Sequence, residues 1–150
     1  MKLLKKKIIS KINQHIEHKI STLDKEIKQA IESRDESTKS SAGDKHETSR
    51  ALIQIELEKL SNQLKKALRE KNELNNLITS SDSKQVGKGS LVKASNGIYF
   101  IGIAIGKIEL DNQHYFCIST ASPIGKLLYN KTVGENIVFK AEKIKILEIH

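Results

Sequence analysis

The sequence is poor in cysteine, which can cross-link a fold, and in proline, which interrupts helices and strands. Its 150 residues include one cysteine, one proline and no tryptophan, and aromatic residues make up only 4%. A single cysteine excludes an internal disulfide and any zinc site built from four cysteines. Cys117 lies in the run His-Tyr-Phe-Cys-Ile, and this apolar setting favours a buried structural thiol over a nucleophile.

Long apolar runs are absent as well. Ile8-Ile9 is followed at once by Ser10 and Lys11, so the N-terminus offers neither a signal peptide nor a membrane span. We therefore expect a cytoplasmic protein without membrane contact. The sequence also has no P-loop, no G-x-G-x-x-G element and no Ser/His/Asp arrangement, so we do not expect an autonomous enzyme.

The formal net charge of the sequence is +8, and the charges are unevenly distributed. Acidic residues are scarce at the start of the chain and become frequent further on. The N-terminal lysines are Lys2, Lys5, Lys6, Lys7 and Lys11, and the later acids are Glu32, Asp35, Glu36, Asp44 and Glu47. This distribution fits a polyanionic or acidic partner for the body of the molecule, and it equally fits a basic face that is simply solvated.

Two runs of apolar residues close to a 3.5-residue period flank a polar segment at residues 38–48. The first contains Ile9, Ile12, Ile16, Ile20, Leu23, Ile27 and Ala30, and the second contains Ile53, Leu57, Leu60, Leu64, Ala67, Leu74 and Ile78. This spacing is typical of coiled-coil seams. If the runs pair antiparallel, opposite positions have residue numbers with a constant sum, as in Leu23 with Leu60 and Ile16 with Ala67. The pattern predicts a helical hairpin over residues 1–79 with its apex between Ser41 and Ala42.

The C-terminal part, residues 84–150, changes to a strand pattern. We expect antiparallel strands at 90–94, 97–105, 114–119, 135–139 and 143–149, separated by turn signals such as Asn96-Gly97 and Asp111-Asn112. Ile144, Ile146 and Ile149 are the expected inward-facing residues of the last strand. Ser122-Pro123 offers an N-cap followed by a proline at the first helical position, and it predicts a short helix from Ile124 to Tyr129. The fold class is therefore α+β, a helical hairpin followed by a small antiparallel β domain with one short helix.

Asp44 and Glu47 have two interpretations. In a capping box, Asp44 caps the second helix and Glu47 reaches back to the backbone of Asp44. Alternatively, two carboxylates one turn apart at the end of a hairpin can offer oxygen ligands to Mg²⁺ that is also held by a partner's active site. Both can hold together, because a cap would fix the geometry of the acids.

These motifs resemble those of a known family. Gly43-Asp44-Lys45-His46-Glu47 has the G-D-x-x-E spacing of the Gre-type bacterial transcript cleavage factors, and Ser122-Pro123-Ile124-Gly125 is similar to their C-terminal S-P-[IL]-[AG] helix. The resemblance implies a coiled coil that enters the secondary channel of RNA polymerase and an FKBP-like domain that docks at the channel rim. It implies that Asp44 and Glu47 help to hold the second catalytic Mg²⁺, so that the polymerase cleaves its own backtracked RNA.

By this resemblance the protein is no enzyme and has no cofactor of its own, sharing Mg²⁺ with the polymerase. It would act as a monomer, contact the RNA 3′ end indirectly, and dock through Ser122, Pro123, Ile124 and Gly125. The tip departs from the family's usual G-D-L-x-E-N-[AS]-E-Y, because Lys45, Thr48, Arg50 and Ala51 replace Leu, Asn, Glu and Tyr. Two alternatives therefore stay open, a regulator that occupies the channel without stimulating cleavage and a coiled-coil protein unrelated to transcription.

Overall fold

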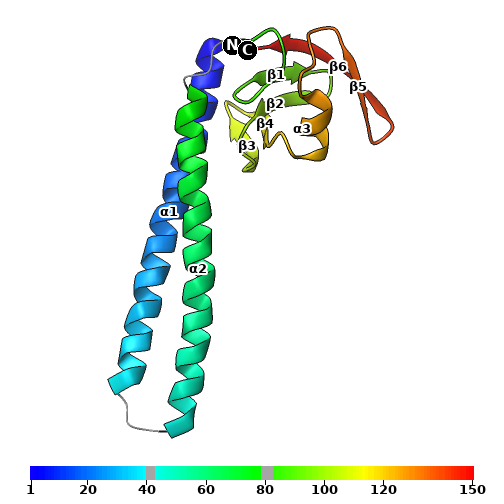
Figure 1. Cartoon of the computed structure of the whole chain (residues 1–150). Helices are drawn as coiled ribbons and strands as arrows, with labels where there is room; N and C mark the ends of the chain where they lie inside the picture. Colours follow the sequence, from blue (N-terminus) through cyan, green and yellow to red (C-terminus); the bar gives the residue numbers. More distant parts are fainter. Residues whose placement is uncertain (40–42, 79–82) are drawn as a thin grey trace. The chain divides into compact units, whose positions relative to one another are not determined.

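Figure 1 shows the computed structural model of the chain, which describes residues 1–39, 43–78 and 83–150, with side chains described outside 38–46 and 78. The fold is α+β, as predicted: two long packed helices precede a six-stranded mixed sheet with one short helix. The elements in chain order are α1 (Lys2–Lys39), α2 (Gly43–Ile78), β1 (Leu91–Ala94), β2 (Gly97–Ile101), β3 (Gly106–Leu110), β4 (Gln113–Ile118), α3 (Pro123–Leu128), β5 (Asn136–Phe139) and β6 (Glu142–Ile149).

The chain divides into two compact units. Unit 1 comprises Met1–Asn13 together with Asn72–His150, and unit 2 comprises Gln14–Lys71. The first turns of α1 and the last turns of α2 thus belong with the sheet, and the rest of the two helices forms a unit of its own. No described helix is long and apolar enough to cross a membrane.

The helix α1 ends at Lys39 and so runs into the polar segment predicted at residues 38–48. The hydroxyl of Ser37 donates to the backbone carbonyls of Ser33 (3.2 Å) and Arg34 (2.9 Å) within the helix. The side chain thus bonds back into the preceding turn, which is compatible with a continuing helix. The predicted apex between Ser41 and Ala42 lies outside the described residues.

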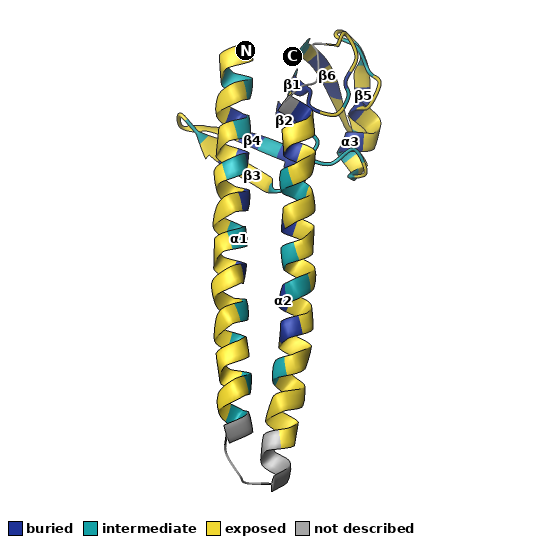
Figure 2. Ribbon diagram, turned by 60° about the vertical axis from the view of Figure 1, so that its left-hand side comes forward, coloured by how far each residue is buried: buried dark blue, intermediate teal, exposed yellow. Residues whose placement is uncertain are grey.

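Unit 2 is held together by the predicted apolar seam. Leu23, Leu60 and Ala67 form a buried cluster, with Ile20, Ile27, Ala30 and Leu64 packed against it. Figure 2 shows the buried residues of the two helices on the facing sides of α1 and α2. Burying a leucine side chain contributes about 1.5–3 kcal/mol, so a few such layers outweigh the exposed ion pair between Lys71 and Glu17, at 3.3 Å. The expected contact of Leu23 with Leu60 is confirmed.

The sheet has the order β3-β4-β2-β1-β6-β5 and is mixed, where we had expected only antiparallel pairs. The pair β2 and β4 is parallel, and the other pairs are antiparallel. The predicted strand at 97–105 ends at Ile101, and residues 106–110 form a separate strand that the sequence pattern did not reveal. This additional strand reverses the chain once more before β4 begins, so β4 runs in the same direction as β2.

The hairpin between β3 and β4 turns at Asp111-Asn112, as the sequence predicted. Both residues have positive φ angles, 52° and 59°, which is the backbone of a type I′ turn. Aspartate and asparagine adopt this conformation more readily than other non-glycine residues. The turn signal was therefore correct, although the strand before it was missed.

One face of the sheet carries the core of the domain. Its buried residues are Val86, Val92, Ala94, Tyr99, Ile101, Leu128, Ile137, Ile144 and Ile146, with Leu128 contributed by α3. Ile144 and Ile146 are fully buried, as predicted, and Ile149 is partly buried. The helix α3 thus covers this face of the sheet.

The opposite face is covered over β1 and β2 within unit 1. Leu91 and Phe100 are fully buried there, and the position of a Cβ built at Gly102 lies 2.5 Å from Leu77 of α2. Gly102 therefore leaves room for the end of α2 to pack on the sheet. At the start of α1, Ile8 is fully buried, as are Ile12 and Ile16, whereas the predicted Ile9 is only partly buried. This part of α1 belongs to the unit that contains the sheet, so its burial does not follow the helix–helix seam alone.

Candidate functional site

The predicted acid pair lies at the start of α2. This helix begins at Gly43, so Asp44 follows directly inside its first turn, and Glu47 is one turn further on. Asp44 is therefore not the residue that precedes the helix, as the capping-box interpretation requires, and its side chain lies outside the described residues. Glu47 is exposed to solvent.

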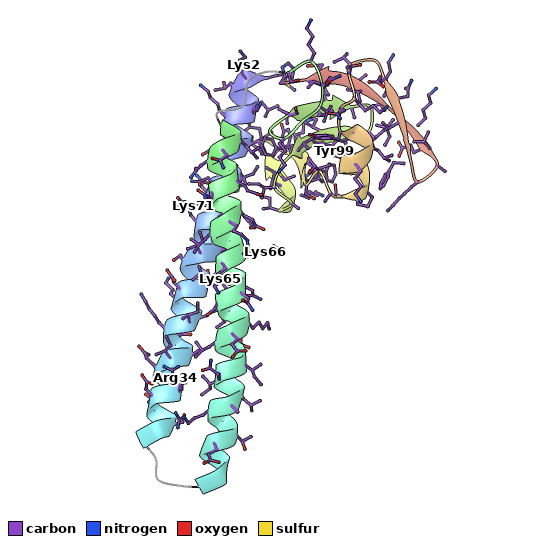
Figure 3. The ribbon with its side chains drawn as sticks, in the orientation of Figure 1. Lys2, Arg34, Lys65, Lys66, Lys71 and Tyr99 are labelled. Carbon is purple, nitrogen blue, oxygen red and sulfur yellow. The ribbon has the colours of Figure 1, made fainter. Side chains whose placement is uncertain are left out.

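Glu47 shares a hollow with two arginines. The hollow has a volume of about 330 Å³ and is lined by Arg34, Glu47, Arg50, Ala51 and Gln54. Arg34 comes from the last turns of α1 (Figure 3), and the other residues come from α2. Arg34 forms an ion pair with Asp35, whose Oδ1 lies 3.6 Å from the Nε of Arg34. One carboxylate and two guanidinium groups thus share this end of unit 2.

The described residues do not form a metal site by themselves. Among the side chains that the structure describes, no group of three His, Cys, Asp or Glu could hold a metal ion. Glu47 offers two oxygens, whereas Mg²⁺ takes six ligands in a strict octahedron. A Mg²⁺ ion at this end would therefore need most of its ligands from water or from a partner.

The second predicted site is the start of α3. Ser122 is its N-cap, with extended backbone angles (φ −65°, ψ 154°), and its hydroxyl accepts a hydrogen bond from the backbone N–H of Gly125 at 3.1 Å. The same hydroxyl donates to the carbonyl of Ser119 at 2.7 Å. Pro123 occupies the first helical position, where its missing N–H costs nothing. The predicted capped helix is confirmed, with Pro123 as its first residue, and it ends at Leu128 instead of Tyr129.

The four predicted docking residues of α3 have different exposures. Pro123 is exposed, Ser122 and Ile124 are half-buried, and Gly125 is buried. Ile124 packs against the core cluster, and Gly125 sits so close to the carbonyl of Ser119 that a side chain at this position would collide with it. Only Ser122 and Pro123 are therefore placed to meet a partner directly, while Ile124 and Gly125 hold the helix on the sheet.

Two apolar side chains beside this helix were not predicted as part of the site. Leu127 is 38% exposed and Tyr129 is 43% exposed. Helical spacing alone did not indicate Leu127, because residues three apart, such as Ile124 and Leu127, lie on one side of a helix. The structure turns Gly125 and Leu128 to the sheet and leaves Leu127 at the edge of that face. With Pro123, these residues give the α3 end an exposed apolar surface.

Cys117 takes no part in either site. The thiol is buried in β4, and burial raises its pKa to about 12. At neutral pH it therefore stays protonated, and the thiolate needed for nucleophilic attack is not populated. The prediction of a structural thiol is confirmed.

Comparison with known proteins adds no assignment, since no family model and no curated protein matches the chain.

Proposed function

We propose that this chain is a transcription elongation factor of the Gre type, which binds RNA polymerase and stimulates cleavage of backtracked RNA. One observation carries the proposal: the chain combines a helical hairpin with an acid pair beside its turn and a sheet domain with a Ser-Pro-capped helix. Sequence resemblance and architecture thus agree in the kind of parts and in their order. The proposed setting is the cytoplasm, with the protein acting as a monomer.

In this mechanism the hairpin turn enters the secondary channel and the polymerase performs the hydrolysis. Asp44 and Glu47 supply carboxylate oxygens near the polymerase site, and a Mg²⁺ ion held there would lower the pKa of its bound water. The protein meets the RNA 3′ end only through this site. Its own contribution is to position two negative charges one helical turn apart at the start of α2.

The α3 surface is the proposed anchor. Ser122 and Pro123, together with exposed Leu127 and Tyr129, would bind the outer rim of the channel. Anchoring raises the effective concentration of the hairpin turn inside the channel, so weak contacts at the turn suffice.

A second candidate function is a regulator that occupies the channel without stimulating cleavage. The observation that favours it is the hollow where Arg34 and Arg50 accompany Glu47. Two positive charges near a carboxylate weaken its attraction for a divalent cation. Such a protein would compete with cleavage factors for the same channel.

The deciding experiment measures binding to core RNA polymerase and RNA cleavage in backtracked complexes for Asp44→Asn and Glu47→Gln. Asparagine and glutamine have nearly the same shapes as aspartate and glutamate, so both changes remove charge with little loss of structure. Glu58→Gln is the matched control, an exposed glutamate further along the same helix.

We expect both variants to bind, while cleavage at limiting Mg²⁺ falls by about 10- to 100-fold, the usual loss when a group that tunes a metal site is removed. Raising Mg²⁺ should restore part of the activity, and Glu58→Gln should behave as wild type. Binding without any cleavage by the wild type would support the regulator instead. No binding to polymerase would leave a coiled-coil protein unrelated to transcription.

A further inference from the structure

The outer face of the β5–β6 hairpin carries exposed apolar side chains beside lysines. Ile144 and Ile146 point into the core, so Lys143 and Lys145 of β6 point outward by strand alternation. Leu147 follows at the point where the register of β6 against β1 shifts, and its side chain is also exposed. Val138 of β5 lies directly opposite Lys143 and shares this face. We call these four residues the basic hairpin face.

The apolar members of this face are unusually open to solvent. Val138 is 64% exposed and Leu147 is 41% exposed. Over β1 and β2 the same side of the sheet is covered, since Leu91 and Phe100 are fully buried there. On this side of the sheet, β1 and β2 are therefore buried, whereas β5 and β6 are exposed to solvent and form the basic hairpin face.

The lysines of the face have no partner among the described residues, because no ion pair or hydrogen bond involves the ammonium group of Lys143 or Lys145. Two acids lie in the same strand: Glu142 adjoins Lys143 on the core-facing side of the alternation, and Glu148 is bound by Lys93 at 2.8 Å and lies 3.3 Å from His150. Neither forms an ion pair with Lys143 or Lys145, so the positive charge of the face has no paired acid among the described residues.

The surroundings reinforce this charge. Unit 1 contains fourteen lysines, no arginine and seven acidic residues, whereas the two charge signs nearly balance in unit 2. An excess of one sign over a whole unit steers a partner of the opposite sign toward it. The partner of the basic hairpin face should therefore be acidic.

The same residues distinguish between acidic partners. Nucleic-acid surfaces without base readout are built from lysine and arginine with aromatic side chains on which bases stack, and the face has no arginine and no aromatic residue. Two aliphatic side chains flanked by lysines instead match a protein surface that has an apolar centre and a rim of carboxylates.

We propose that the basic hairpin face is a second docking surface, which binds an acidic protein surface with an apolar centre. This inference rests on the proposed function, and the partner surface would belong to RNA polymerase. It lies on the sheet face opposite the one that α3 covers, so it is separate from the Ser122-Pro123 contact. The partner would then contact both faces of the sheet near its β5 edge, one through Ser122-Pro123 and the other through the basic hairpin face.

The test is the affinity of full-length protein for core RNA polymerase after charge reversal, using Lys143→Glu with Lys145→Glu. The control is Lys88→Glu with Lys107→Glu, two exposed lysines of unit 1 outside the face, which changes the net charge by the same amount. Val138→Asn is a third variant that removes the apolar contact and keeps the charge. The urea midpoint of each variant, followed by tyrosine fluorescence, checks that unit 1 is folded.

We expect the Lys143/Lys145 variant to bind about tenfold more weakly at low salt, with the difference shrinking as salt screens the charges. The control should stay within about twofold, and Val138→Asn should lose affinity at every salt concentration. A photo-crosslinker at position 138 should label a polymerase segment rich in Asp and Glu.

The outcomes separate the two proposals. If wild-type protein does not bind polymerase, both the proposed function and this inference are wrong. If wild type binds and the Lys143/Lys145 variant binds as tightly as the control, the inference is overturned while the proposed function stands. A loss confined to binding of an RNA or DNA oligonucleotide would overturn it as well, because it would assign the face to nucleic acid.

Discussion

Replacing Gly125 with alanine tests how tightly α3 is held on the sheet. A Cβ built at this position would collide with the carbonyl oxygen of Ser119, and it would lie 3.2 Å from the Ser119 carbonyl carbon and 2.6 Å from the hydroxyl of Ser122. The Ser119 carbonyl also accepts hydrogen bonds from the hydroxyl and the backbone N–H of Ser122. A side chain here must therefore push the helix away from the turn that caps it.

The expected cost combines three effects. Overpacking costs about 1–3 kcal/mol, and loss of the cap costs about 1 kcal/mol. Alanine in place of glycine inside a helix returns about 1 kcal/mol. The net destabilisation is about 2 kcal/mol, a large share of the stability of a small domain.

Urea unfolding followed by tyrosine fluorescence measures this change in unit 1 alone. The chain has no tryptophan, and its three tyrosines all lie in unit 1, at positions 99, 115 and 129. The midpoint should fall by about 1 M urea, given the slopes usual for small domains. The signal does not depend on whether the two units unfold together.

Gly87→Ala is the matched control, because a Cβ at Gly87 meets nothing within 4 Å and its φ angle is not positive. Its midpoint should stay close to that of wild type or rise slightly, since alanine restricts the unfolded chain. Equal midpoints for Gly125→Ala and Gly87→Ala would refute the argument that close approach to Ser119 fixes α3. With the proposed function, Gly125→Ala should also weaken polymerase binding.

Three further predictions concern the hairpin and the turns. Cysteines at Leu23 and Leu60 should form a disulfide within the monomer at low protein concentration, and cross-links found only between chains would contradict the intramolecular hairpin. Ala141→Gly should stabilise unit 1 by about 1 kcal/mol, because Ala141 has a φ angle of 65° that strains a residue with a Cβ. Asn112→Gly, at a φ angle of 59°, should stabilise unit 1 by less, because asparagine tolerates this conformation better than alanine. Equal stabilisation by the two changes would count against strain at Ala141. Hydrogen bonds from the backbone N–H and the hydroxyl of Thr132, and then from Lys131, hold the pKa of Glu135 below its usual range. The stabilising contribution of Glu135 is therefore complete above the ordinary glutamate pKa of about 4.3, and it is lost as pH falls through the lowered pKa. The acid limb of a stability–pH curve should therefore be flatter in Glu135→Gln, and an unchanged limb would show that these hydrogen bonds do not favour the charged form.

Much of the architecture followed from local sequence patterns. The heptad spacing predicted two helices and their antiparallel register, because a helix without proline or glycine must bury its one apolar stripe and the turn length fixes how the stripes align. Ser122-Pro123 predicted the start of α3, since an N-cap and a first-turn proline act within a few residues. The inward set Ile144 and Ile146 followed from strand alternation in the same way.

The tertiary structure decided what depends on contacts between distant segments. The strand β3 has a weak pattern of its own and exists because it pairs with β4, and this pairing makes β4 run parallel to β2. The requirement for glycine at 125 is invisible in the sequence, because it arises from the carbonyl of Ser119. The basic hairpin face likewise became apparent only from the cover over the neighbouring strands, since alternation alone shows which residues point outward but not which of them remain bare.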